Sequence, residues 1–166
     1  MPASPLFTVA ALLALLLAVP AHALETGTIA PTLSLPQRDG SSLHMPDGRA
    51  RLTYVDFWAS WCGPCRQSFP WLNRMQARYA AQGLRVVGIN LDAKTADAER
   101  FLQEVPAQFE IALDPQAQSA KRYALKGMPS AALLAADGRV IAVHQGFRPG
   151  DAEALEALIK SHLDKP

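Results

Sequence analysis

Residues 52–65, with the sequence LTYVDFWASWCGPC, join a short apolar segment directly to a pair of cysteines. Residues 52–58 are rich in aromatic and β-branched side chains, a composition typical of a buried central strand. After the pair, apolar residues recur at helical spacing as far as Gly83, which is expected to end the helix. The cysteines are therefore predicted to lie between a buried strand and the N-terminus of a helix.

This placement favours redox chemistry. A cysteine at a helix N-terminus faces unpaired backbone N–H groups and the positive end of the helix dipole, and both stabilise a thiolate. The thiolate is the attacking species in thiol–disulfide exchange, so a lowered pKa makes such a cysteine reactive near neutral pH. Gly63 and Pro64 separate Cys62 from Cys65, and this spacing lets the two sulfurs meet across one helical turn. Pro64 fits the first turn because its missing N–H would have had no partner there.

Three other uses of a Cys-x-x-Cys pair compete with this one. A zinc site needs two further ligands, but the chain has no second such pair, and its four histidines, at positions 22, 44, 144 and 162, are scattered. Covalent haem needs a histidine after the second cysteine, where this chain has Arg66. A structural disulfide that closes so short a loop would stabilise the fold little. We expect no metal site, and His44 and His144 are interpreted as ordinary strand or surface histidines.

Length and composition indicate one ordinary domain. The chain has 166 residues, of which 49% are hydrophobic and 19% charged, enough apolar surface for a real core. Sixteen Lys and Arg against fifteen Asp and Glu leave a formal charge of +1 without a dense basic block, which argues against nucleic-acid binding. Both cysteines belong to one pair, so the fold has no long-range disulfide to stabilise it.

The first 23 residues predict an export signal. Residues 7–19 are apolar apart from Thr8, and Ala21-His22-Ala23 has the small-x-small pattern of a cleavage site. A helix formed by residues 7–19 alone, at about 1.5 Å per residue, is too short to cross a hydrocarbon core of about 30 Å. No Lys or Arg precedes the apolar run, which leaves an uncleaved membrane anchor as the alternative. We expect residues 1–23 to be a signal peptide and residues 24–166 to be a periplasmic domain.

The rest of the chain alternates strands and helices. Residues 24–51, rich in Pro, Gly and Ser, are predicted to form a hairpin or extended cap. Asp137-Gly138 is a two-residue turn signal between the last two predicted strands. The further predicted strands are 84–91, 109–113, 131–135 and 140–144, and the further helices are 95–104, 116–125 and 151–163. This alternation indicates an α/β fold with helices on both faces of a central sheet.

Residues 55–65, VDFWASWCGPC, closely resemble the active-site segment of the thioredoxin superfamily. Pro70 lies where that family kinks its active-site helix, and residues 127–130, GMPS, resemble the family's cis-proline loop. The resemblance extends from residue 52 to the C-terminus. It implies a thioredoxin fold, with a central mixed sheet flanked by helices, in which Cys62 is the nucleophile and Cys65 the resolving thiol.

Three features narrow the resemblance to one branch of the superfamily. The helix and strand predicted over 95–113 are absent from minimal thioredoxins, and the chain also has an N-terminal extension and an export signal. Together these resemble the TlpA/ResA-type periplasmic thiol–disulfide proteins, which include cytochrome c maturation reductases. Maturation members usually carry an acid just after the strand predicted here at 84–91, and Asp92 lies one position out of register. Cytochrome c maturation is therefore not the favoured role. The branch implies a membrane thiol transporter as electron donor.

Asp56 is unexpected among the apolar residues of its strand. Burial of an unpaired carboxylate is costly and raises its pKa. Its position six residues before Cys62 matches the buried aspartate of the family, which implies that Asp56 accepts the proton of Cys65. The alternative is a strand-end carboxylate that pairs with Lys or Arg or reaches solvent.

The resemblance also implies a substrate-binding surface. A cis bond before Pro129 would turn the Met128 backbone toward Cys62, where it can pair with an extended substrate segment. Met128 departs from the family, in which β-branched residues are commoner at this position. A shallow apolar groove is expected from Trp61, Gly63, Pro64, Met128, Pro129 and Gly146. Ordinary packing is the alternative role for Trp61 and Met128.

These observations predict an exported protein-disulfide reductase that acts by dithiol exchange. Gly63-Pro64 between the cysteines resembles the reducing thioredoxins rather than the oxidising branch. We expect protein disulfides as substrates, no cofactor besides the redox-active disulfide, and a monomer. The alternative is a docking or Cu(I)-handling module without turnover. Cu(I) suits two soft thiolates, but no Met or His lies beside the pair to complete such a site.

Overall fold

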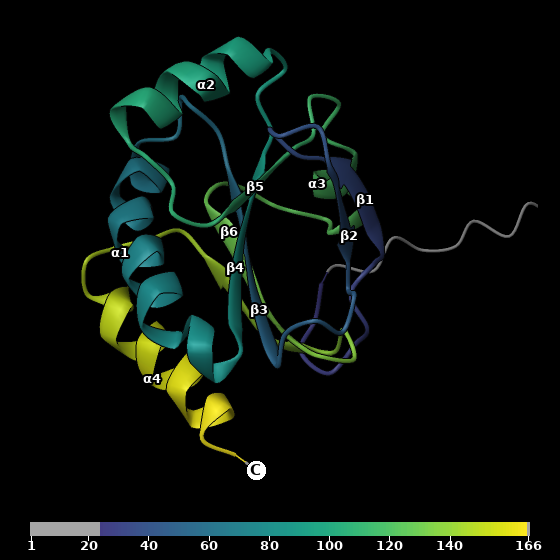
Figure 1. Cartoon of the computed structure of the whole chain (residues 1–166), viewed down its shortest axis with the longest axis vertical. Coiled ribbons are helices and arrows are strands. Elements are labelled where there is room, and N and C mark those ends of the chain that lie inside the picture. Colours follow the sequence, from purple (N-terminus) through teal and green to yellow (C-terminus); the bar gives the residue numbers. More distant parts are fainter. Residues whose placement is uncertain (1–23, 166) are drawn as a thin grey trace, which may run out of the picture.

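The computed structural model describes residues 24–165, and the predicted export signal lies outside this range. Its centre is a five-stranded mixed sheet with the order β5-β4-β3-β6-β7 (Figure 1). β3, β4 and β5 run parallel, whereas β6 pairs antiparallel with β3 and β7 antiparallel with β6. The expected central mixed sheet is confirmed, and each strand lies within one residue of its prediction: β3 Leu52–Trp58, β4 Leu84–Asn90, β5 Glu110–Leu113, β6 Ser130–Ala135 and β7 Val140–Gln145.

The central strand β3 is buried on both faces. On the first face of the sheet, Leu52, Tyr54 and Trp58 contribute to a first hydrophobic cluster. On the second face, Val55 and Phe57 contribute to a second cluster. The two sets alternate because successive side chains of a strand point to opposite faces. Both clusters are therefore anchored on the strand that leads to the cysteines.

Three helices cover the first face of the sheet: α1 (Gly63–Tyr79), α2 (Thr95–Glu104) and α4 (Asp151–Leu163) (Figure 1). Pro70 lies inside α1, at the predicted position. A 3₁₀ turn, η1 (Ala80–Gln82), continues α1, and Gly83 ends it with a left-handed φ of 102°. None of the helices within residues 24–165 is long and apolar enough to span a membrane.

The sequence predicted helices on both faces of the sheet. On the second face, however, a hairpin covers most of the surface (Figure 1). This hairpin, β1 (Leu33–Pro36) with β2 (Ser42–Met45), confirms the interpretation of residues 24–51. The helix predicted over 116–125 is only α3 (Gln118–Arg122). Ala117 and Ala124 adopt positive φ values of 51° and 47°, which confines the helix between them.

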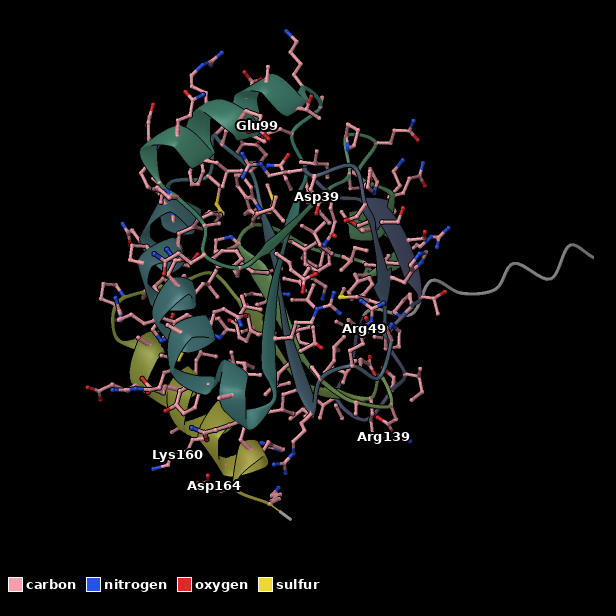
Figure 2. All side chains as sticks on the ribbon, viewed as in Figure 1. Asp39, Arg49, Glu99, Arg139, Lys160 and Asp164 are labelled. Carbon is pink, nitrogen blue, oxygen red and sulfur yellow. A yellow bond between two sulfur atoms is a disulfide. The ribbon has the colours of Figure 1, made fainter. Side chains whose placement is uncertain are left out.

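Charged side chains lie mainly on the outside of the fold. Asp39 and Lys160 are exposed, and Lys160 lies on the outer side of α4 in Figure 2. Buried polar groups are few, and several of them lie near the cysteines: Asp56, Ser68, Asn90, Asp92, Asp114, Ser119 and Ser130.

Candidate active site

The cysteine pair lies where β3 ends and α1 begins, as the sequence predicts. Cys62 is the N-cap residue of α1, and its Sγ accepts a hydrogen bond from the Cys65 backbone N–H at 3.3 Å. The two sulfurs form a disulfide with an S–S distance of 1.96 Å. No acidic residue lies in the first turn of α1, so the positive end of the helix dipole is not offset there. The site is therefore suited to hold a thiolate once the disulfide is reduced.

The two cysteines differ in access to solvent. Cys62 is 5% exposed and Cys65 is fully buried. Trp61, directly before the pair, is 72% exposed, and Gly63 and Pro64 are exposed as well. An incoming disulfide can therefore reach Cys62 past exposed neighbours, whereas Cys65 is shielded.

Asp56 is the buried titratable group closest in sequence to the pair. It is 2% exposed and lies on the same face of β3 as Tyr54 and Trp58. Burial raises its pKa to about 8. Its Oδ2 has no hydrogen-bond partner, and no ion pair reaches its carboxylate within the described residues. The alternative of a solvated or ion-paired strand-end carboxylate is therefore wrong.

The proline loop lies at the same end of the sheet as the cysteines. The Met128–Pro129 bond is cis, as the family resemblance implies. Ser130 follows this bond and pairs with Phe57, next to the last residue of β3. The Gly146 N–H donates to the Pro129 carbonyl at 2.8 Å, which ties the end of β7 to the loop. Met128 is half-buried against the first hydrophobic cluster.

A hydrogen-bond network behind the cysteines was missed by the sequence analysis. Asp92 is buried, and its carboxylate accepts the Ser60 backbone N–H and the Ser60 hydroxyl, both at 2.9 Å. The Asn90 amide donates to the same carboxylate at 2.8 Å. The available signal was the pair of polar residues, Asn90 and Asp92, at the end of the predicted strand 84–91. A second cis bond, Met45–Pro46, was also missed and lies away from the site.

The histidines lie apart from the cysteines. His44 is exposed on β2, and His144 on β7 places Nε2 at 3.4 Å from Asp151 Oδ2. Within residues 24–165, no three side chains of His, Cys, Asp or Glu gather as the ligands of a metal ion would.

Comparisons with known proteins agree with this geometry. A family model described as Redoxin matches residues 25–159. The thiol-disulfide oxidoreductase ResA of Bacillus thuringiensis subsp. konkukian is 26% identical over 137 residues, which cover 82% of this chain and 78% of that protein. The ResA protein of Bacillus subtilis is 24% identical over 125 residues, with 75% and 70% covered.

A solved structure is more similar. The crystal structure of a protein described as thiol:disulfide interchange protein DsbE from Chlorobium tepidum is 51% identical and superimposes with a TM-score of 0.82. The match covers 85% of this chain and 99% of that one. Sequence and structure thus point to the same group of proteins.

Proposed function

This chain belongs to the Redoxin family, as a TlpA/ResA-like thiol–disulfide oxidoreductase of the thioredoxin superfamily, and from that premise we propose that it reduces protein disulfides in the periplasm. The observation that carries the proposal is a buried carboxylate without a partner, Asp56, on the strand that leads into a disulfide at a helix N-terminus. A carboxyl with a pKa near 8 can take up and release a proton near neutral pH.

The first step is attack by Cys62. In the reduced protein its thiolate attacks one sulfur of a substrate disulfide, and the other substrate sulfur leaves with the electron pair of the broken bond. The products are a mixed disulfide between Cys62 and the substrate and one free substrate thiol. The greater exposure of Cys62 and its N-cap position support this assignment.

The second step is resolution by Cys65. Its thiol gives its proton to the Asp56 carboxylate, and the resulting thiolate attacks the Cys62 sulfur. The bond between Cys62 and the substrate breaks, and the substrate sulfur leaves as a thiolate that then takes up a proton. The substrate has gained two electrons, and Cys62 and Cys65 are again a disulfide. A membrane thiol transporter is the proposed source of the electrons that restore the dithiol.

The surface around Cys62 is the proposed substrate site. Trp61, Gly63 and Pro64 are exposed on one side of it. On the other side, the Gly146 N–H donates a hydrogen bond to the Pro129 carbonyl in the loop that also carries Met128. An extended substrate segment would pair with the Met128 backbone and lie across these residues.

The reducing direction rests on Gly63-Pro64 between the cysteines. A change of about 30 mV in the reduction potential corresponds to only about 1.4 kcal/mol. The reduction potential is therefore the quantity that tests the direction. Equilibration with glutathione gives the reduction potential, which we expect near the thioredoxin value of about −270 mV. A value near about −120 mV, that of a strong oxidant, would overturn the proposed direction.

Turnover is tested with insulin reduction. We expect the wild-type protein to reduce insulin in the presence of dithiothreitol and Cys62→Ser to be inactive. Cys65→Ser should instead trap substrates as mixed disulfides on Cys62, and capture from the periplasm of the native host identifies them. If Cys62→Ser leaves the rate unchanged, the chain is a docking module rather than a reductase.

Export is tested on the mature protein. Recovery of the chain in the periplasm with Leu24 as its first residue is the expected result. Recovery in the membrane with the first residues intact would instead identify an uncleaved anchor.

A further inference from the structure

The cysteine loop, residues 59–62, shares one edge of the sheet with three neighbouring loops. β3 and β4 run parallel, and β7 runs in the same direction because both β3 and β7 are antiparallel to β6. The carboxyl ends of β3, β4 and β7 therefore lie at this edge, together with the start of β6. The three neighbouring loops are residues 91–94 after β4, residues 123–129 before β6 and residues 146–150 after β7.

Hydrogen bonds hold these loops together. The Leu91 N–H donates to the carbonyl of Trp58, the last residue before the cysteine loop, at 2.9 Å. The Gly146 N–H donates at 2.8 Å to the Pro129 carbonyl, in the loop that also carries Met128. A client protein that presents its disulfide to the nucleophile therefore meets side chains from all three neighbouring loops.

Each of the three neighbouring loops carries one exposed cation, and these are Lys94, Lys126 and Arg148. Lys126 lies two residues before Met128, and Arg148 lies two residues after Gly146. Within residues 24–165, no ion pair involves any of the three cations. Their charges are therefore available to a partner molecule.

Most carboxylates near this edge already have partners. Asp92 is buried and accepts hydrogen bonds from the cysteine loop. Asp151, at the start of α4, accepts the Arg148 backbone N–H at 2.8 Å. Glu104 pairs at 3.0 Å with Arg66, in the first turn of α1. Two further carboxylates are likewise bonded, Asp97 and Asp114. The exposed charge that a client can contact is therefore mainly positive.

The cations are not equivalent. Glu25 is exposed and lines the same cavity as Lys126, so the charge of Lys126 is partly offset. Lys94 and Arg148 have no such neighbour on their own loops. Because β4 and β6 flank β3 on opposite sides, these two cations lie on opposite sides of Cys62. A client segment that crosses Cys62 from one side to the other therefore meets a cation on each side.

We propose that Lys94, Lys126 and Arg148 form a cationic rim around Cys62 that selects protein disulfides flanked by acidic residues. Complementary charges raise the rate at which two protein surfaces meet productively, and like charges suppress the wrong partners. The rim thus favours clients with Asp or Glu on either side of their disulfide and disfavours basic ones. The exchange chemistry of Cys62 and Cys65 is the same for every client. This inference rests on the proposed function, because it names the class of substrate.

Three peptides test the preference. Each is closed by one disulfide, and they differ only in the residues beside the two cysteines, which are Glu, Gln or Lys. Reduced protein is mixed with excess peptide and quenched with acid, and its remaining thiols are alkylated and counted by mass spectrometry. The dependence on peptide concentration gives the second-order rate constant for attack by Cys62. At low salt we expect the Glu peptide to react about 10-fold faster than the Lys peptide, with the Gln peptide between them. In about 1 M salt, where the Debye length is about 3 Å, the rates should agree within about 2-fold.

Two triple variants locate the effect. The rim variant combines Lys94→Gln, Lys126→Gln and Arg148→Gln, and its rates for the Glu and Lys peptides should agree within about 2-fold at low salt. The readout is this ratio, because loss of nearby cations can also weaken the Cys62 thiolate, which slows all three peptides equally.

The control variant combines Arg49→Gln, Lys160→Gln and Lys165→Gln, which remove the same net charge at the other end of the fold. Arg49 precedes β3, and Lys160 and Lys165 lie at the end of α4. In Figure 2, Lys160 lies toward the bottom of the view and α2 at the top. This variant should keep the wild-type preference for the Glu peptide.

The outcomes also distinguish the rim from the function on which it rests. If the wild type reduces all three peptides at equal rates, or prefers the Lys peptide, the function stands and the rim is wrong. A preference that survives in the rim variant, or that the control variant loses as well, would also overturn the rim. If the wild type reduces none of the peptides, or if Cys62→Ser reduces them equally fast, the proposed function fails and the rim fails with it.

Discussion

The Asp92 carboxylate accepts two hydrogen bonds from Ser60, one from its backbone N–H and one from its hydroxyl, each at 2.9 Å. Ser60 lies two residues before Cys62, and Asp92 follows the end of β4. This contact joins the loop that carries the nucleophile to the neighbouring strand. The loop is therefore held by the sheet as well as by the start of α1.

Removal of this carboxylate should destabilise the protein. In Asp92→Ala, the part-buried N–H of Ser60 and the buried side-chain amide of Asn90 lose their acceptor, and an unsatisfied buried group costs about 1–3 kcal/mol. Ser60→Ala loses only the hydroxyl bond and should cost about 1 kcal/mol. Urea unfolding of the oxidised proteins measures both. Asp97→Ala, which breaks an exposed pair with Arg100 and removes the acidic side chain from the first turn of α2, is the control and should cost less than about 1 kcal/mol. Equal stability of Asp92→Ala and this control would contradict the role of the network.

The pH dependence of turnover should report Asp56. Its pKa of about 8 predicts that the rate of resolution rises with pH through this region, because only the carboxylate can accept the Cys65 proton. In Asp56→Asn the rate should fall about 100-fold, and the inflection near pH 8 should disappear. With Ellman's disulfide, reduced protein releases a first thionitrobenzoate when Cys62 attacks and a second when Cys65 resolves the mixed disulfide. Stopped-flow measurement of this second phase between pH 6 and pH 10 gives the profile. A variant whose profile matches the wild type would exclude Asp56 as the proton acceptor.

The same group should make stability depend on pH. The pKa of Asp56 is raised in the folded protein from 3.8 to about 8, so the folded state holds its proton more tightly than the unfolded chain does. The stability associated with the neutral carboxyl is fully present below about pH 4 and is lost as the pH rises to about 8. Asp56→Asn should therefore become more stable relative to the wild type by up to about 1.4 kcal/mol for each pH unit in this window.

Urea unfolding of both oxidised proteins at several pH values checks this sign. Asp97→Asn, at an exposed position on α2, provides the baseline. A difference between wild type and Asp56→Asn that stays constant from pH 4 to pH 8 would show that the Asp56 pKa is not raised.

Trp61 should matter for binding and not for folding. Its side chain is 72% exposed, so Trp61→Ala should change the free energy of unfolding by less than about 0.5 kcal/mol. If Trp61 contacts substrate proteins, the same change should raise the KM for insulin several-fold. The attack of Cys62 on the small molecule Ellman's disulfide should keep its rate. Ile29→Ala, which truncates another exposed apolar side chain, is the matched control. Equal KM values for the three proteins would remove Trp61 from the substrate site.

Local sequence was sufficient for most of the fold. Residues 52–58 form β3 and residues 95–104 form α2, with the predicted boundaries. The cysteines lie at the predicted junction of strand and helix. These features follow from side-chain periodicity and helix-end signals, which act between residues a few positions apart.

Contacts between distant segments decided the rest. Strand position alone did not decide whether the Asp56 carboxylate is buried without a partner or pairs with Lys or Arg. The packing of α1 and α4 over the sheet encloses it without a partner. The order of the strands places Asp92 beside Ser60. A Cβ on Gly88 would lie 3.1 Å from the indole nitrogen of Trp58, a close approach that exists only in the folded sheet. The dithiol was thus determined by its own sequence, whereas its proton chemistry depends on burial, which is a property of the whole fold.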